Sequence, residues 1–290
     1  MRMDFADKVV VVTGAGRGLG RAHAIEFAKR GAKVVVNDLG GAVDGTGSGN
    51  TAQAVVNEIK NTGGEALANT ASVADIQGAQ SIIDSAVNHY GTVDILVNNA
   101  GILRDKTFAN MTITNFQAVL DVHLMGTVYT TKAAWPIMSE KGWGRVVFTS
   151  SGTGILGNFG QSNYATAKMG MIGLMNVLKL EGHRKGIRIN CLAPGATTTR
   201  MTENLQDPNR IPGDPALVSP AVLYLCSEDA PNGIILEAEQ GRFSIAELWV
   251  TDGISLGSNV TYEDLLGHVD EILNDRSLHP VPPRIPRKPK

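Results

Sequence analysis

Short apolar runs rich in β-branched residues alternate along the chain with longer segments whose apolar residues recur at helical spacing. The first run, residues 9–12, consists of four valines, which is typical of a strand buried on both faces. This alternation predicts an α/β fold: a doubly wound (Rossmann) seven-stranded, largely parallel sheet with helices on both faces. The pattern predicts strands at 9–12, 33–37, 65–69, 93–97, 145–149, 187–192 and 246–250, and helices at 19–30, 51–61, 76–90, 114–138, 163–182, 220–227 and 262–273.

Two segments interrupt this alternation. Residues 40–49 contain five glycines and are expected to form a loop between the second strand and its helix. Residues 194–220 are rich in Pro, Thr and Asn, and we expect a flap over a site there. We therefore expect one domain over residues 1–257, which includes this flap, and a C-terminal helix with a proline-rich tail over residues 258–290.

Composition narrows the class of protein. A content of 43% hydrophobic and 19% charged residues in 290 provides ample apolar surface for a core. The net charge of −2 offers no basic excess to neutralise a nucleic acid, so no nucleic-acid partner is expected. Only two cysteines, a charged N-terminus and no apolar run of membrane-spanning length favour a cytoplasmic protein with no membrane partner. The six histidines lie far apart, and no metal site is expected.

The turn after the first predicted strand has the pattern of a dinucleotide-binding loop. It reads Thr13-Gly14-Ala15-Gly16-Arg17-Gly18-Leu19-Gly20 and leads into the first helix. Glycines let the backbone approach a pyrophosphate, and the helix N-terminus supplies free N–H groups and the positive end of its dipole.

Asp38 ends the second predicted strand, at the position where a ribose would lie. A carboxylate there accepts hydrogen bonds from a ribose 2′-hydroxyl and repels a 2′-phosphate, which favours NAD over NADP. Arg17 in the glycine turn argues the other way, because a base there would attract a 2′-phosphate. We give Asp38 more weight, since the following Leu39 offers no basic partner.

Tyr164 and Lys168 are four residues apart on a predicted helix and therefore share a face. A nearby ammonium and an oxidised nicotinamide would lower the tyrosine pKa, which is ordinarily about 10. Ser151 ends the preceding strand, where its hydroxyl would hold the substrate oxygen while Tyr164 exchanges a proton with it.

These motifs together resemble the short-chain dehydrogenase/reductase family over nearly the whole chain, and two more pieces strengthen the likeness: residues 98–101 (Asn-Asn-Ala-Gly) and Pro194-Gly195 followed by Thr199. The resemblance implies that Ser151, Tyr164 and Lys168 are catalytic and that the first domain binds NAD. The cofactor-binding residues that we expect from the motifs and the resemblance are Gly14, Arg17, Gly18, Leu19, Gly20, Asp38, Ser72, Val73, Asn99, Ala100, Gly101, Tyr164, Lys168, Pro194, Gly195, Thr197 and Thr199.

One position departs from the wider family, which usually has an asparagine on the long helix to hold a water behind the lysine. This chain has His123 there. The histidine either packs as an ordinary helix residue, or its imidazole or the backbone carbonyl of its turn serves the same proton relay.

A closer resemblance is to the (3R)-hydroxyacyl-CoA dehydrogenase domain of peroxisomal multifunctional enzyme type 2, and it covers that one domain. It implies oxidation of (3R)-hydroxyacyl-CoA to 3-ketoacyl-CoA with NAD, in a homodimer or homotetramer. The alternatives are an NADPH-dependent 3-oxoacyl carrier-protein reductase, a steroid or sugar-alcohol dehydrogenase, and a non-catalytic nucleotide sensor. The stretches that carry the likeness, the last of which includes His123, are residues 34–41, 98–108, 157–161 and 122–124.

Overall fold

The computed structural model describes residues 4–195 and 213–280 of the 290-residue chain. The chain divides into two compact units, residues 1–245 and 246–290. The boundary expected at residue 257 lies within the second unit. No helix among the described residues is long and apolar enough to cross a membrane.

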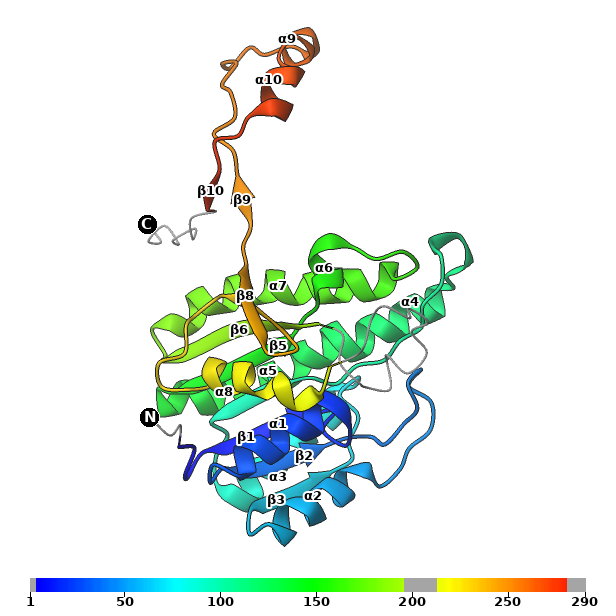
Figure 1. Cartoon of the computed structure of the whole chain (residues 1–290), viewed down its shortest axis with the longest axis vertical. Coiled ribbons are helices and arrows are strands. Elements are labelled where there is room, and N and C mark those ends of the chain that lie inside the picture. Colours follow the sequence, from blue (N-terminus) through cyan, green and yellow to red (C-terminus); the bar gives the residue numbers. More distant parts are fainter. Residues whose placement is uncertain (1–3, 196–212, 281–290) are drawn as a thin grey trace. The chain divides into compact units, whose positions relative to one another are not determined.

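A single eight-stranded sheet forms the centre of the first unit (Figure 1). Its strand order is β3-β2-β1-β4-β5-β6-β7-β8, and the neighbours from β3 to β7 pair in parallel. The order reverses between β1 and β4, so a crevice is expected outside the carboxyl ends of these strands. The strands are β1 (Val9–Thr13), β2 (Lys33–Asn37), β3 (Glu65–Asn69), β4 (Ile95–Asn98), β5 (Gly144–Thr149), β6 (Ile187–Pro194), β7 (Ile235–Glu239) and β8 (Arg242–Ala246).

The doubly wound, largely parallel sheet is confirmed, but the expected count of seven strands and the position of the last strand are wrong. The seventh strand is β7, and a two-residue turn at Gln240 and Gly241 connects it to the added edge strand β8. Both turn residues have positive φ (48° and 82°), as a tight antiparallel hairpin requires. The apolar pattern of β7 is interrupted by Glu237, which pairs in register with Ala193 of β6. Of the strand expected at 246–250, only Ala246, the last residue of β8, belongs to the sheet.

Helices cover both faces of the sheet (Figure 1). On one face lie α1 (Gly18–Ala28), α2 (Thr51–Asn61) and α8 (Ser219–Leu225), and on the other α3 (Ile76–Tyr90), α4 (Ile113–Leu120), α5 (Gly126–Lys141) and α7 (Ser162–His183). Short helical segments are α6 (Gly152–Leu156) and the 3-10 turns at Phe108–Asn110 and Pro215–Leu217, the last of which lies in the expected flap.

The long helix expected over residues 114–138 is interrupted by a single π turn at Asp121–Met125, which separates α4 from α5. Pro136 does not end α5, which continues to Lys141. A proline removes the N–H that would bond the carbonyl four residues earlier, here that of Lys132. Because Lys132 is exposed, water can bond that carbonyl in place of the missing N–H.

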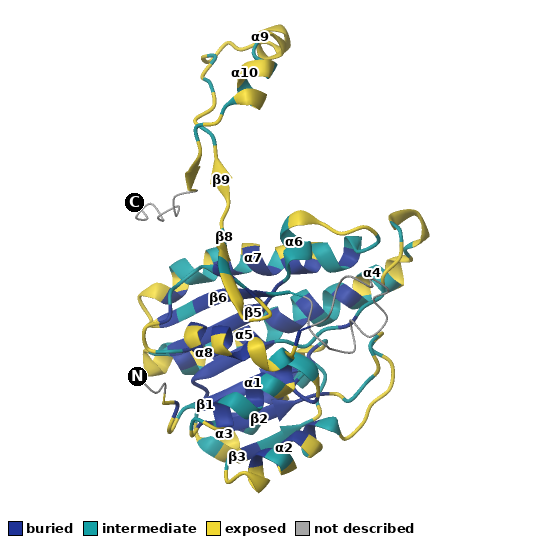
Figure 2. Cartoon of the chain, in the orientation of Figure 1, coloured by how far each residue is buried: buried dark blue, intermediate teal, exposed yellow. Residues whose placement is uncertain are grey.

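The core follows from local sequence. All five residues of β1 are buried, as the run of valines predicts, and Figure 2 shows the buried strands between the two helical layers. α3 illustrates how polar residues set helix limits: the Asp75 side chain accepts a hydrogen bond from the Gly78 N–H (2.6 Å), and Gly91 ends the helix with φ 85°.

The second unit contains α9 (Tyr262–Gly267) and α10 (Val269–Asn274). The single helix expected over 262–273 is therefore divided in two at His268. It also contains an antiparallel ribbon of β9 (Trp249–Val250) and β10 (His279–Pro280).

Candidate active site

The glycine turn between β1 and α1 brings the backbone close to its neighbours. Gly14 and Gly18 have φ of 63° and 53°, which favour glycine. A Cβ on Gly14 would lie 2.7 Å from the Ala100 Cα, and one on Gly20 would lie 2.3 Å from the Gly14 carbonyl oxygen. Arg17 caps the N-terminus of α1 without a side-chain hydrogen bond, so the first N–H groups of the helix have no capping side chain.

Asn99 and Thr13 hold this turn against the end of β4. The Asn99 side chain donates to the carbonyl oxygens of Thr13 and Gly14, at 3.0 Å each. The Thr13 hydroxyl oxygen accepts hydrogen bonds from the N–H groups of Asn99 (3.0 Å) and Ala100 (3.1 Å). Asn99, which we expected to bind the cofactor, therefore holds the turn in place and does not line either pocket.

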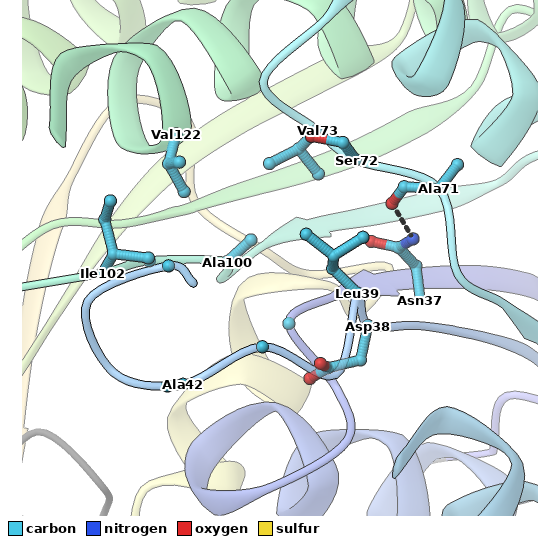
Figure 3. Close-up of a pocket in the computed structure, with 14 residues that line it drawn as sticks. Asn37, Asp38, Leu39, Ala42, Ala71, Ser72, Val73, Ala100, Ile102 and Val122 are labelled. Carbon is cyan, nitrogen blue, oxygen red and sulfur yellow. Dashed lines mark hydrogen bonds between the residues drawn. The ribbon is translucent and has the colours of Figure 1, made fainter. Parts of the chain in front are cut away.

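A hollow with about 540 Å³ of space that includes open solvent lies beside the turn, at the carboxyl ends of β1, β2 and β4 (Figure 3). Six expected cofactor residues line it: Gly14, Asp38, Ser72, Val73, Ala100 and Gly101. Its other lining residues, which the sequence motifs did not point to, are Asn37, Leu39, Gly41, Ala42, Gly45, Ala71, Ile102 and Val122. We call this hollow the adenosine pocket, after the half of the cofactor that it would take.

Asp38 is the charged residue among the described residues that line the adenosine pocket (Figure 3), and it is 8% exposed. One carboxylate oxygen accepts from the Gly16 N–H (2.8 Å), and the other from the Gly40 N–H (2.7 Å) and the Thr51 hydroxyl (3.3 Å). A carboxylate has about four acceptor positions, so at least one stays available to a ligand hydroxyl. Arg17 is exposed and does not line this pocket. The glycine cradle and Asp38 therefore fit a nucleotide cofactor.

A second and larger hollow, with about 1500 Å³ of space that includes open solvent, adjoins the ends of β5, β6 and β7. The expected residues Ser151, Tyr164, Pro194 and Gly195 line it. We call it the substrate pocket. Its other lining residues are Leu103, Asp105, Gly152, Thr153, Leu156, Gly157, Asn158, Gln161, Ala193, Glu237, Ala238, Glu239, Arg242 and Ser244.

The β7–β8 hairpin supplies polar residues of the substrate pocket that sequence reasoning missed. Glu237 accepts a hydrogen bond from the Ser244 hydroxyl (2.9 Å). A Cβ on Gly195 would lie 2.4 Å from the Glu239 Cδ, so the expected cofactor residue Gly195 leaves room for that glutamate. Arg242 faces the same pocket. No sequence motif marks these residues, because only the hairpin brings them beside β6.

Ser151, Tyr164 and Lys168 come together at the end of β5. Ser151 caps α6, and its hydroxyl oxygen accepts from the Thr153 N–H (3.2 Å). Tyr164 and Lys168 lie one turn apart on α7, and the Lys168 Nζ lies 5.3 Å from the Tyr164 ring centroid. Lys168 is 2% exposed, and its Nζ donates to the carbonyl oxygen of Thr149 (2.5 Å).

In the chain without cofactor, burial raises the pKa of Tyr164 to about 12, while hydrogen bonding to Ser151 acts in the opposite direction. The lowering expected from the sequence also requires an oxidised nicotinamide beside the tyrosine. Burial also lowers the pKa of Lys168 to about 7. Both effects have one cause, because the interior disfavours phenolate and ammonium alike.

His123 lies in the π turn and is buried. Its Nε2 is 3.0 Å from the backbone nitrogen and 2.8 Å from the carbonyl oxygen of Ile102, and its ring packs edge-on against Tyr164 at 5.2 Å. Burial, and then the charge of Lys168, hold the pKa of His123 well below its ordinary value. The His123 carbonyl accepts from the Thr127 hydroxyl (2.7 Å). The buried imidazole of His123 is therefore neutral.

The other described residues of the expected cofactor set fall outside the two pockets. Gly18, Leu19 and Gly20 form the first turn of α1, and Lys168 lies behind Tyr164. Thr197 and Thr199 lie outside the described residues. Among the residues that are described, no three His, Cys, Asp or Glu side chains are grouped so that they could hold a metal ion.

A doubly wound sheet with a glycine turn at its switch point, next to a serine, tyrosine and lysine, defines a nicotinamide-dependent oxidoreductase. The chain belongs to the short-chain dehydrogenase family, whose model, described as short chain dehydrogenase, matches residues 8–210. Members of this family act on small molecules with nicotinamide cofactors, and the chain is an enzyme of that class.

Two relatives and one solved structure show the range of similar proteins. A Mycobacterium tuberculosis protein described as a short-chain type dehydrogenase/reductase is 46% identical over 92% of this chain and 94% of its own length. Peroxisomal multifunctional enzyme type 2 of Drosophila melanogaster is 48% identical over 83% of this chain, which spans 40% of that longer protein. The crystal structure of a short chain dehydrogenase from Mycobacterium avium superposes with a TM-score of 0.83 at 41% identity, covering 96% of this chain and 98% of the other.

Proposed function

We propose that the protein is an NAD-dependent dehydrogenase that interconverts a secondary alcohol and a ketone, most specifically (3R)-hydroxyacyl-CoA and 3-ketoacyl-CoA. The observation that carries the proposal is the meeting of Ser151, Tyr164 and Lys168 at the end of β5, where Ser151 and Tyr164 line the substrate pocket. In this proposal the Ser151 hydroxyl holds the substrate oxygen, and Tyr164 takes the hydroxyl proton. When bound, the nicotinamide would accept the hydride from the carbinol carbon.

Lys168 has two proposed roles at this site. Its Nζ, already fixed by the Thr149 carbonyl, would hold the nicotinamide ribose, and its positive charge would favour the Tyr164 phenolate. Because burial alone raises the pKa of Tyr164 to about 12, the tyrosine is expected to work as a base only with Lys168 protonated and an oxidised cofactor in place. Proton transfer would then depend on cofactor occupancy.

Asp38 supports NAD over NADP. Its carboxylate lines the adenosine pocket and already accepts three hydrogen bonds from the protein. A 2′-phosphate would bring a second anion against this carboxylate, and no lysine or arginine lines the described pocket to offset the repulsion. A 2′-hydroxyl, in contrast, would donate a charge-assisted hydrogen bond to it.

The acyl-CoA substrate is supported by the sequence resemblance and by the 48% identity to multifunctional enzyme type 2. The lining of the substrate pocket agrees with a substrate that is neutral near its alcohol. Three carboxylates (Asp105, Glu237 and Glu239) and one described base (Arg242) line it. This excess of negative charge disfavours binding of a free hydroxy acid, whereas an uncharged thioester group is not repelled.

The test is an assay of NADH or NADPH formation from (3R)- and (3S)-3-hydroxyacyl-CoA of several chain lengths, with NAD and NADP in parallel. We expect turnover of the (3R) series, with NAD preferred by about tenfold or more, the effect of one charge-assisted hydrogen bond. Absence of turnover with either hand at every chain length would overturn the substrate assignment. Preferred reduction of a 3-oxoacyl carrier protein with NADPH would replace it with the reductase alternative.

The cytoplasmic location and the homodimer or homotetramer expected from the sequence stay predictions.

A further inference from the structure

The segment 102–106, which follows the Asn-Asn-Ala-Gly motif, separates the two pockets. Ile102 lines the adenosine pocket, whereas Leu103 and Asp105 line the substrate pocket. Arg104 lies between them and lines neither. A residue in this place can therefore affect a pocket that it does not touch.

The glycine-rich loop 39–49 forms one wall of the adenosine pocket. Leu39, Ala42 and Gly45 line the pocket from this loop, and Ile102 lines it from segment 102–106 (Figure 3). The five glycines between residues 40 and 49 give the loop a large conformational entropy to lose when it closes. A closed loop therefore needs contacts that hold its tip in place.

Two hydrogen bonds hold the tip of loop 39–49 against segment 102–106. The Leu103 N–H donates to the Val43 carbonyl (3.0 Å), and the Arg104 Nε donates to the Asp44 carbonyl (2.8 Å). A second guanidinium nitrogen of Arg104 donates to the side-chain oxygen of Asn115 at the start of α4 (3.2 Å). The guanidinium thus joins the loop to a helix of the main body.

Arg104 is itself firmly anchored. Its carbonyl oxygen accepts a hydrogen bond from the side chain of Asn163 (3.0 Å), which is fully buried at the start of α7. The Asn163 side-chain oxygen in turn accepts from the N–H of Tyr164 (2.8 Å). The anchor for the loop is therefore continuous with the helix that carries Tyr164.

We propose that Arg104 is a positioning residue that clasps loop 39–49 over the adenosine pocket and so sets the affinity for the nicotinamide cofactor. The inference rests on the proposed NAD site for its ligand. Without the guanidinium the closed loop is populated less in the free protein, and apparent cofactor affinity falls in proportion to that population. The backbone of Arg104, and with it the link to Asn163, is unaffected by changes to the side chain.

The test compares Arg104→Met with Arg21→Met, a matched control that removes the surface Arg21–Glu58 ion pair between α1 and α2. The first measurement is peptide-level hydrogen exchange of residues 39–50 in the free protein, which needs no ligand. The second is fluorescence titration with NADH, accompanied by kcat at saturating NAD.

For Arg104→Met we expect faster exchange of the loop and about tenfold weaker NADH binding, the effect of losing one or two hydrogen bonds from a charged donor. We expect kcat at saturating NAD to stay near the wild-type value, and Arg21→Met to match wild type throughout. Arg104→Lys should recover part of the affinity, since an ammonium can reach one of the two acceptors.

Loop exchange and NADH affinity that both equal those of wild type in Arg104→Met would overturn the inference. Equal losses of affinity and of kcat at saturation would also overturn it, because they would indicate general damage to the site. If the wild-type chain bound neither NADH nor NADPH, the proposed function would fail, while the exchange measurement would still decide whether Arg104 clasps the loop.

Discussion

Replacing Lys168 by Met should make the protein more stable at neutral and acidic pH while it removes a group proposed to be catalytic. Burial lowers the pKa of Lys168 from 10.5 to about 7. At 1.36 kcal/mol per pH unit, this difference means that the buried ammonium costs about 5 kcal/mol of folding free energy below pH 7. This loss of folding free energy occurs at a site where the charge of the ammonium can act on Tyr164.

The direction in which folding stability changes with pH follows from proton binding. Between pH 7 and 10.5 the unfolded chain holds the Lys168 proton more tightly than the folded chain does, so folding stability rises with pH through this window. From pH 7 to pH 9 the wild type should gain about 2 kcal/mol relative to Lys168→Met. At pH 6 the variant should be more stable by about 2–4 kcal/mol, because leaving the Thr149 carbonyl without its donor costs about 1–3 kcal/mol of the 5.

The assay is urea unfolding of the cofactor-free protein at pH 6, 7, 8 and 9. Lys132→Met, at an exposed position on α5, is the matched control and should follow the pH dependence of wild type. A stability difference between wild type and Lys168→Met that is constant across these pH values would refute the reasoning. It would show that Lys168 keeps an ordinary pKa in the fold, and that the interior does not penalise its charge.

Three further predictions concern the two pockets. Tyr164→Phe should reduce kcat by about 100-fold or more, because a positioned acid–base group is lost, and should leave NADH binding unchanged; unchanged turnover would contradict the proton-transfer role. Asp38→Asn should reduce the ratio of NADPH to NADH dissociation constants by about tenfold or more in parallel titrations, and an unaltered ratio would show that Asp38 does not read the ribose. Gly101→Ala should cost about 1–3 kcal/mol in urea unfolding, since its Cβ would lie 2.3 Å from the His123 Cε1. His123→Ala in that background should recover part of the loss, whereas wild-type stability of Gly101→Ala would contradict the close contact.

Sequence patterns predicted the elements whose character is set locally. The valines of β1 are apolar and β-branched throughout, so they form a buried strand in any parallel sheet. The glycine turn is recognisable because positive φ and close backbone contact exclude other residues at Gly14 and Gly20. The four-residue spacing of Tyr164 and Lys168 fixes their common face on one helix.

The errors arose where long-range contacts outweighed local pattern. β7 contains glutamates that weaken its apolar signal, yet pairing with β6 and the tight turn at Gln240 and Gly241 make it a strand and add β8. The prediction of a single long helix was wrong because the π turn places His123 against Ile102 and Tyr164. The helical spacing of apolar residues does not predict such a contact.

The sequence by itself therefore determined the fold class, the nucleotide turn and the identity of the residues proposed to react, because each of these depends on neighbours within one turn or strand. Tertiary structure alone decided how those residues behave. Burial raises the pKa of Tyr164 and lowers that of Lys168 because distant elements exclude water from both. Likewise, Arg104 can hold a loop 60 residues earlier in the chain only because the sheet brings the ends of β2 and β4 to the same edge.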